Sequence, residues 1–215
     1  MPAGLRVIDP TSLPEIDLQA EIPWHGQSGG DDLLALVMGR VLGGGSEDGM
    51  KAAGPSTAMM AVRVLANAIS LPPARTLVGH RFLDMIDIGH RALGVWHEKK
   101  GVRTAVGALA INAAVFLATE PAVCGPETFA SVTALAVGLC SGEDDPTVLG
   151  RGLRALSTLG LMAVRAEARG DGELAALLFE PGSGVVDAID WGAMDTDPVV
   201  RQTALALHAY RGGAD

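Results

Sequence analysis

The chain has 215 residues, of which 48% are hydrophobic and only 4% aromatic, so it can bury one sizeable core and favours closely packed helices over a β-sandwich. Its net charge of −9 argues against nucleic acid as a partner, because such binding depends on neutralising phosphates. No apolar run reaches the ~18–20 residues that span a bilayer, so no membrane association is expected.

The first 55 residues are expected to contain one main helix between two irregular stretches, with a short helix in SLPEIDLQAEIP (12–23). Residues 1–30 are rich in proline and form an irregular N-terminal extension. Residues 31–42 are predicted to be helical, because two aspartates stand at their start, where the helix dipole favours negative charge. Residues 43–55 are polar and rich in glycine, and we expect them to be a flexible connection.

Apolar residues recur at helical spacing through the rest of the chain. Gly89 is expected to divide 74–96 into two helices. Asp145 and Asp197 each precede a proline, an arrangement in which the aspartate caps a helix and the proline occupies its first turn. No stretch alternates with the period of a strand, so the chain is predicted to be all-α. The other predicted helices are 55–71, 102–119, 127–140, 146–169, 173–179, 185–191 and 198–211.

Three of these segments resemble versions of one helix. Asn67, Asn112 and Thr158 fall in register when 60–71, 107–118 and 152–163 are overlaid, at spacings of 45 and 46 residues. A further step of that size ends within 199–210. A helical repeat of this length is typical of an armadillo/HEAT-like helical solenoid. We expect residues 1–215 to form a single domain of that kind.

Charge is unevenly distributed along the chain. Residues 51–112 hold eight basic and three acidic side chains, whereas 1–50 hold two and eight, and 113–215 hold six and fourteen. An acidic protein therefore contains a basic middle, which could attract a short acidic peptide.

Five polar residues of the repeated helix are candidates for binding that peptide. In a solenoid, stacked helices bring residues about one repeat apart to within ~10 Å of each other. Arginine forks onto carboxylates and asparagine bonds to backbone amides. The alternative is that the arginines pair with internal acids or reach solvent. The candidates are Arg63, Asn67, Asn112, Arg151 and Arg154.

An enzymatic alternative rests on a cluster of histidines and aspartates. His80 and Asp84 share a helical face, Asp87 lies near it, and His90 and His97 follow. Such residues could form a metal site or an acid–base pair, although their spacing matches no known ligand pattern. We expect no cofactor and no bound metal, and read these residues as polar groups at helix faces and ends.

The two cysteines are expected to be buried, free thiols. Cys124 and Cys140 stand in apolar surroundings without the spacing of a metal site. The N-terminus lacks the basic and apolar segments of a secretory signal. A reducing, cytoplasmic location is therefore expected.

Four segments in order resemble motifs of the PUL domain, which occurs in phospholipase A2-activating protein and related ubiquitin-pathway adaptors. MAVRVLANAI (60–69) is similar to the pattern LxLRxLxNxF, LAINAAVFL (109–117) to LxLNxSVxL, and RGLRALSTLG (151–160) to RxLxALGTL. LPEIDLQAEIP (13–23) resembles a degenerate FPxLDxLR. The resemblance extends from about Leu13 to Ala209.

The resemblance implies an armadillo-like solenoid without enzymatic activity, which acts as an adaptor in ubiquitin-dependent protein turnover. Its implied partner is the acidic C-terminal tail of valosin-containing protein, a hexameric AAA ATPase, held in a basic concave groove by a monomeric domain. The groove arginines of the family fall on Arg63 and Arg151, and its motif asparagines on Asn67 and Asn112. Arg154 replaces an apolar residue of the pattern. A cytoplasmic location is implied, with the nucleus as a second compartment.

The chain also departs from the family pattern. Gln19 stands where the family often has arginine, and Ala113 and Ala114 replace larger residues after the motif asparagine. Ser157 replaces a glycine. A generic armadillo/HEAT scaffold for another partner therefore remains the main alternative.

Overall fold

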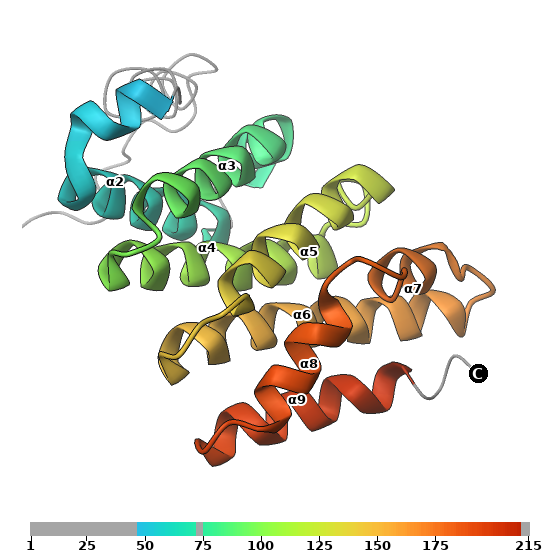
Figure 1. The fold of residues 1–215 in the computed structure, drawn as a ribbon. Coiled ribbons are helices and arrows are strands. Elements are labelled where there is room, and N and C mark those ends of the chain that lie inside the picture. Colours follow the sequence, from blue (N-terminus) through green and yellow to red (C-terminus); the bar gives the residue numbers. More distant parts are fainter. Residues whose placement is uncertain (1–46, 72–74, 212–215) are drawn as a thin grey trace, which may run out of the picture.

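The computed structural model describes residues 47–71 and 75–211, and these contain eight helices and no strand (Figure 1). The predicted irregular extension (1–30), the helix at 31–42 and the start of the flexible connection lie outside these residues. The helices are α2 (Glu47–Ser70), α3 (Arg75–Trp96), α4 (Lys100–Thr119), α5 (Pro126–Cys140), α6 (Pro146–Glu167), α7 (Glu173–Leu178), α8 (Val185–Ala193) and α9 (Pro198–Arg211).

The helices form two layers. α2, α4, α6 and α9 stack side by side in a first layer, while α3, α5, α7 and α8 cover one side of it (Figure 1). The side chain of Asn112 reaches the main chain of Ala66 in the neighbouring helix, 46 residues earlier. The predicted repeat length and the all-α helical solenoid are therefore confirmed.

α4 is the central helix of the first layer. Ten of its 20 residues are buried, because α2 and α6 flank it and α3 and α5 cover it. By length and hydropathy alone α4 could cross a membrane, so the expectation that no segment is apolar and long enough does not hold for 100–119. Its burial among four helices explains that apolar composition.

α2 begins earlier than predicted. Residues 47–53, which the sequence predicts to be part of the flexible connection, are helical. The helix is kinked at Gly54, whose φ of 78° and ψ of 162° only glycine adopts readily. Pro55 then starts the second segment, as expected for a proline in a first helical turn.

α3 is one continuous helix, so the predicted break at Gly89 is wrong. A Cβ atom at Gly89 would lie 2.9 Å from Leu109 of α4 and 3.2 Å from Leu135 of α5. The glycine therefore permits three helices to approach closely, and it does not interrupt the helix. In the local sequence, a glycine that breaks a helix and a glycine that allows close packing look the same.

The helix starts at Asp145 and Asp197 are confirmed. Asp145 Oδ1 accepts hydrogen bonds from the backbone N–H groups of Thr147 and Val148, at 3.0 and 3.3 Å. Asp197 Oδ1 accepts from Val199 and Val200 at 2.8 and 3.2 Å. These caps satisfy N–H groups that have no partner within the helix.

Candidate peptide-binding face

Charge separates by layer in this fold. The first-layer helices contain nine arginines and lysines and three carboxylates, which stand at the start of α2 (Glu47 and Asp48) and at the end of α6 (Glu167). The second-layer helices contain three arginines and six carboxylates. The basic region is therefore a layer of alternate helices, and not the continuous stretch 51–112 that the sequence suggested.

The first layer has one side open to solvent. The inner helices α4 and α6 are flanked by neighbours and covered on one side by the second layer, so their exposed and half-buried residues share the remaining side, and we assign the exposed residues of the end helix α2 to the same surface. We call this surface the arginine face. Its residues are Met60, Arg63, Val64 and Asn67 of α2, Ala108, Ile111 and Val115 of α4, and Arg151, Arg154, Thr158, Leu161 and Arg165 of α6.

α2 contributes Arg63 and Asn67 to this face. The two residues are four positions apart, so they lie on the same side of the helix, opposite the buried Leu65. Both are exposed. Neither side chain forms a hydrogen bond or ion pair with any described residue, so both are open to a ligand.

α6 contributes a row of three polar residues and one leucine. Arg154, Thr158, Leu161 and Arg165 recur at spacings of three and four, which places them on one side of the helix. Within residues 47–71 and 75–211, neither Arg154 nor Arg165 has a partner for its guanidinium. Arg165 is not among the residues predicted from the sequence, although its position seven residues after Thr158 could have indicated it.

Arg151 has a partly structural role. The side chain is half-buried, and Nη1 donates to the backbone carbonyl of Thr104 in α4. It passes directly over Gly107, where a Cβ atom would lie 2.9 Å from both Cβ and Cδ of Arg151. Gly107 is thus the residue that lets Arg151 cross between α6 and α4, and sequence reasoning gave no reason to single it out.

Asn112 also joins two helices. Its Nδ2 donates to the carbonyl oxygen of Ala66 in α2 at 2.7 Å. The side chain therefore lies at the edge of α4 toward α2, and one of its two amide N–H groups is already occupied. The two motif asparagines differ for this reason, since Asn67 is exposed and Asn112 is a contact between repeats.

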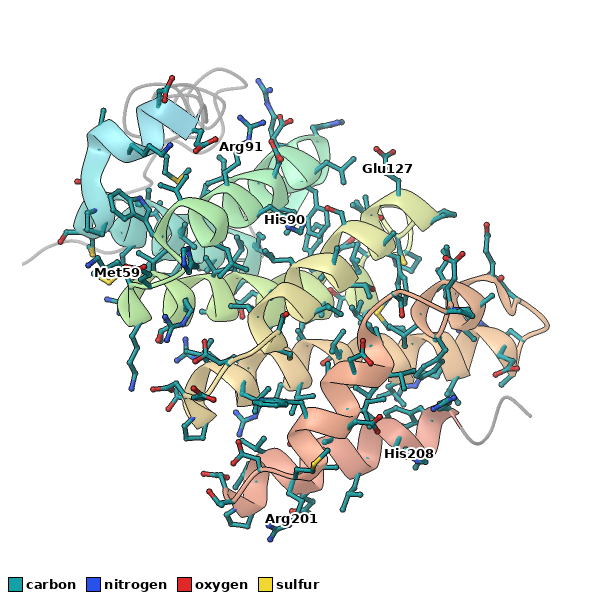
Figure 2. The ribbon with its side chains drawn as sticks, viewed as in Figure 1. Met59, His90, Arg91, Glu127, Arg201 and His208 are labelled. Carbon is teal, nitrogen blue, oxygen red and sulfur yellow. The ribbon has the colours of Figure 1, made fainter. Side chains whose placement is uncertain are left out.

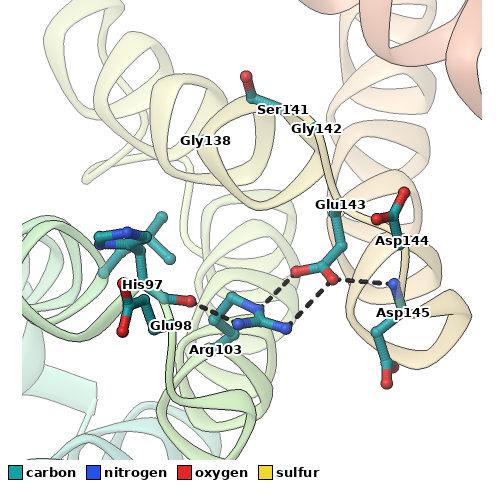
Figure 3. A pocket seen from close by; sticks show the side chains of 10 residues that line it. His97, Glu98, Arg103, Gly138, Ser141, Gly142, Glu143, Asp144 and Asp145 are labelled. Carbon is teal, nitrogen blue, oxygen red and sulfur yellow. Dashed lines mark hydrogen bonds and ion pairs between the residues drawn. The ribbon is translucent and has the colours of Figure 1, made fainter.

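The basic residues at the start of α4 are committed to internal ion pairs. Lys100 Nζ lies 2.5 Å from Asp145 Oδ2. Arg103 Nε lies 2.6 Å from Glu143 Oε2, and its Nη1 donates to His97 O at 2.5 Å (Figure 3). Glu143 is 8% exposed. These side chains tie α4 to the α5–α6 connection and leave Arg63, Arg154 and Arg165 as the unpaired cations of the face.

Apolar side chains lie between the arginines. Met60 and Val64 on α2, Val115 on α4 and Leu161 on α6 are each at least 37% exposed. In this part of the fold, exposed apolar groups therefore accompany cations that have no internal partner. Such a surface suits a peptide that carries both carboxylates and apolar side chains.

The histidines and aspartates of the enzymatic alternative do not form a metal-binding cluster among the described residues. Among the residues that the structure describes, no three histidine, cysteine, aspartate or glutamate side chains are grouped to hold a metal ion. Asp84 pairs with Arg81 at 3.2 Å, and Asp87 pairs with Arg91. His90 points from α3 toward α5, with Nε2 3.0 Å from the carbonyl oxygen of Ser131 (Figure 2).

The cysteines are free, but only one is buried. Cys140 is buried and Cys124 is half-buried, so the expectation of two buried thiols is wrong for Cys124. Burial raises the pKa of the Cys140 thiol to about 12. Burial also raises the pKa of Cys124, with a smaller contribution from the negative charge of Asp171.

The fold is an all-α helical solenoid whose first layer presents unpaired arginines to solvent. The family model of the PUL domain matches residues 25–180. The chain belongs to the PUL domain family, as its motifs predicted. No curated protein and no solved structure gives a significant match to the chain.

Proposed function

We propose that the arginine face binds an acidic peptide, and that the peptide is the acidic C-terminal tail of the AAA ATPase valosin-containing protein. The observation that carries the first half of the proposal is the separation of charge by layer. None of Arg63, Arg154 and Arg165 forms an ion pair with a described residue, and the first-layer helices hold nine basic side chains against three carboxylates. The partner's identity is supported by membership of the PUL family.

The geometry suits an extended segment that crosses the helices. Neighbouring packed helices lie ~8–10 Å apart, so α2 and α6 are separated by about 20 Å. An extended chain advances ~3.3–3.6 Å per residue, which makes a segment of about six residues long enough to reach from Arg63 to Arg154. Apolar residues of α4 lie beneath its middle, and arginines lie at both ends.

Two of the five candidate residues are assigned a different role in this proposal. Arg63, Asn67 and Arg154 have free side chains and contact the peptide directly. Asn112 and, in part, Arg151 hold neighbouring helices in the register that creates the face. Arg151 retains further N–H donors, because a guanidinium has five.

The biological setting follows from the proposed partner. The domain would act as an adaptor of that ATPase in ubiquitin-dependent protein turnover, in the cytoplasm and the nucleus, and would bind the tail as a monomer. A generic helical scaffold for another acidic partner is the competing function, since the alanines after Asn112 and the arginine at 154 depart from the family pattern.

Titration of the purified chain with a synthetic tail peptide distinguishes the two functions. The proposal predicts saturable binding that weakens as salt rises, because the contacts are between exposed charges. A peptide of the same composition in scrambled order is the control. Equal affinity for both peptides would contradict the tail as the specific partner, and absence of binding would contradict the peptide-binding function itself.

A further inference from the structure

A hollow of about 170 Å³ opens between α5 and α8 in the second layer. None of its lining residues belongs to the arginine face. α8 begins after the last residue that matches the PUL domain model, so the matched region does not contain this hollow by itself. Its apolar walls are formed by Val137, Cys140, Ala188 and Trp191.

The close approach of α8 to α5 depends on Gly184. This residue precedes α8 with a φ of 78°, and a Cβ atom there would lie 2.7 Å from Cγ1 of Val137. Glycine tolerates this backbone conformation and also leaves the space that Val137 occupies. The start of α8 is therefore held against α5, which fixes the two sides of the hollow.

Trp191 presents an aromatic ring whose position is fixed. Its Nε1 donates to the backbone carbonyl of Glu143 at 3.0 Å, and the residue is still 47% exposed. The side chain of Glu143 is in turn paired with Arg103. A ligand would not have to order the ring, so little conformational entropy is lost on binding. The face of an indole attracts cations, and most often the guanidinium of arginine.

Asp187 places a carboxylate beside this ring. It stands four residues before Trp191, so the two side chains lie on the same side of α8, and both line the hollow. Asp187 is exposed, and its carboxylate forms no hydrogen bond or ion pair with a described residue. A guanidinium can therefore stack on the indole while its N–H groups bond to the carboxylate.

The surroundings of the hollow are acidic. Residues 126–145 and 171–197, which include α5, α7 and α8, contain eleven aspartates and glutamates and no lysine or arginine. Lys100 and Arg103 of α4 are paired with only two of these carboxylates. The field around the hollow is therefore negative, which is opposite in sign to the arginine face and complementary to a basic partner.

We propose that this hollow binds an arginine side chain from a basic segment of a partner protein, with the guanidinium held between Asp187 and the indole of Trp191. Met194 follows Trp191 by three residues and is 77% exposed, so it extends the apolar surface for the rest of that segment. The domain then has two binding surfaces of opposite charge, one in each layer. The inference does not depend on the acidic tail peptide, because it uses no residue of the arginine face.

Titration of the full chain with a short, fluorescently labelled peptide in which arginine alternates with alanine tests the proposal. The salt concentration should be about 0.1 M, at which exposed charges more than ~10 Å apart are largely screened. We expect Asp187→Asn to weaken binding about tenfold, the equivalent of one charge-assisted contact. Trp191→Leu, which keeps an apolar side chain without the ring, should weaken it about threefold.

Glu127→Gln is the matched control. Glu127 is an exposed carboxylate of the same layer, but it lies in the first turn of α5, at the end of the helix away from the hollow (Figure 2). Its removal changes the net charge as Asp187→Asn does, and should change the affinity less than about twofold. Thermal unfolding of each variant checks that it is folded.

Two further peptides test the chemistry of the occupant. Citrulline in place of arginine keeps the shape and removes the charge, and should abolish binding. Lysine in place of arginine should weaken binding severalfold, because an ammonium does not fork onto a carboxylate. Equal losses from Asp187→Asn and Glu127→Gln would show that the acidity of the whole layer attracts the peptide, and would overturn the hollow as the site. Equal affinity for the arginine and lysine peptides, or absence of binding to the wild type, would also overturn the proposal.

Discussion

Arg151 of α6 lies over Gly107 of α4 so closely that a Cβ atom at 107 would stand 2.9 Å from two of its carbon atoms. The same arginine donates to Thr104 O. The contact sets the separation and register of two first-layer helices, and these helices carry most of the arginine face. A residue expected from its motif to bind a partner therefore also helps to shape the surface.

Gly107→Ala should destabilise the protein. Alanine is intrinsically favoured over glycine in a helix by up to ~1 kcal/mol, but the clash with Arg151 costs ~1–3 kcal/mol. We expect a net loss of about 1 kcal/mol in the free energy of unfolding, measured with urea. Gly94→Ala is the control, because no atom lies within 4 Å of a Cβ at that exposed position, and it should stabilise.

The effect of Gly107→Ala on the free energy of unfolding should change sign when Arg151 is removed. In an Arg151→Ala background, Gly107→Ala no longer meets a side chain and should be neutral or stabilising. If Gly107→Ala costs the same in both backgrounds, Arg151 is not what requires glycine at this position.

The two motif asparagines should respond differently to truncation. Asn112→Ala removes the 2.7 Å bond to Ala66 O, whereas the exposed Asn67 makes no such bond. We expect Asn112→Ala to be less stable than Asn67→Ala by ~0.5–1.5 kcal/mol, the net value of one hydrogen bond. Equal unfolding free energies for the two variants would show that the contact contributes nothing.

Asp145 should stabilise the fold mainly as a helix cap. Asp145→Ala removes the acceptor for two N–H groups and should cost ~1 kcal/mol. Asp145→Asn keeps an acceptor and loses only the ion pair with the exposed ammonium of Lys100, so its cost at neutral pH should be below ~0.5 kcal/mol. Urea unfolding of both variants at pH 7 measures the difference.

The ion pair gives Asp145 a defined pH dependence. The hydrogen bond from Lys100, and then the backbone N–H groups, hold the pKa of Asp145 below its ordinary value of 3.8. Its contribution is therefore complete above that value and is lost as pH falls through the lower folded-state pKa. The small advantage of wild type over Asp145→Asn should vanish in strong acid. An advantage that persists there would contradict this assignment.

The cysteines should differ in reactivity. The thiolate is the reactive form, and burial raises the pKa of Cys140 to about 12, so this thiol remains protonated at pH 8. In native protein a thiol reagent should label Cys124 slowly and leave Cys140 unlabelled. Cys124→Ser should abolish native labelling, and denaturant should expose Cys140. Rapid labelling of Cys140 in native Cys124→Ser protein would contradict its burial.

The sequence predicts a helix boundary correctly where neighbouring residues in the chain determine that boundary. The aspartate–proline pairs at 145 and 197 mark helix starts that the structure confirms. Gly89 was misread because the reason for that glycine lies in Leu109 and Leu135, which belong to other helices. The repeat spacing predicted the solenoid since it reflects packing between equivalent helices.

The candidate site was harder to predict from the sequence, because the ion pairs of its basic side chains involve residues far away in the chain. Sequence alone could not show that Lys100 and Arg103 are paired with Asp145 and Glu143, some 40 residues later. The sequence also does not show which helices share a layer, so it could not show that the basic side chains gather in one of the two layers. Once the helices are arranged in layers, the excess of basic over acidic side chains in the first-layer helices becomes visible, and Arg165 joins the unpaired cations.

The central claim is that the arginine face binds acidic peptides, and charge reversal tests it most directly. The affinity of the tail peptide for wild type, Arg63→Glu, Arg154→Glu and the control Arg81→Glu should be measured by titration at low salt. Arg81 is exposed on α3 in the second layer, so its reversal changes net charge equally but away from the face. We expect Arg63→Glu and Arg154→Glu each to lose ~1.5–3 kcal/mol of binding free energy. The control Arg81→Glu should change the affinity less than about twofold. Equal affinities for all three variants would contradict the arginine face as the binding site.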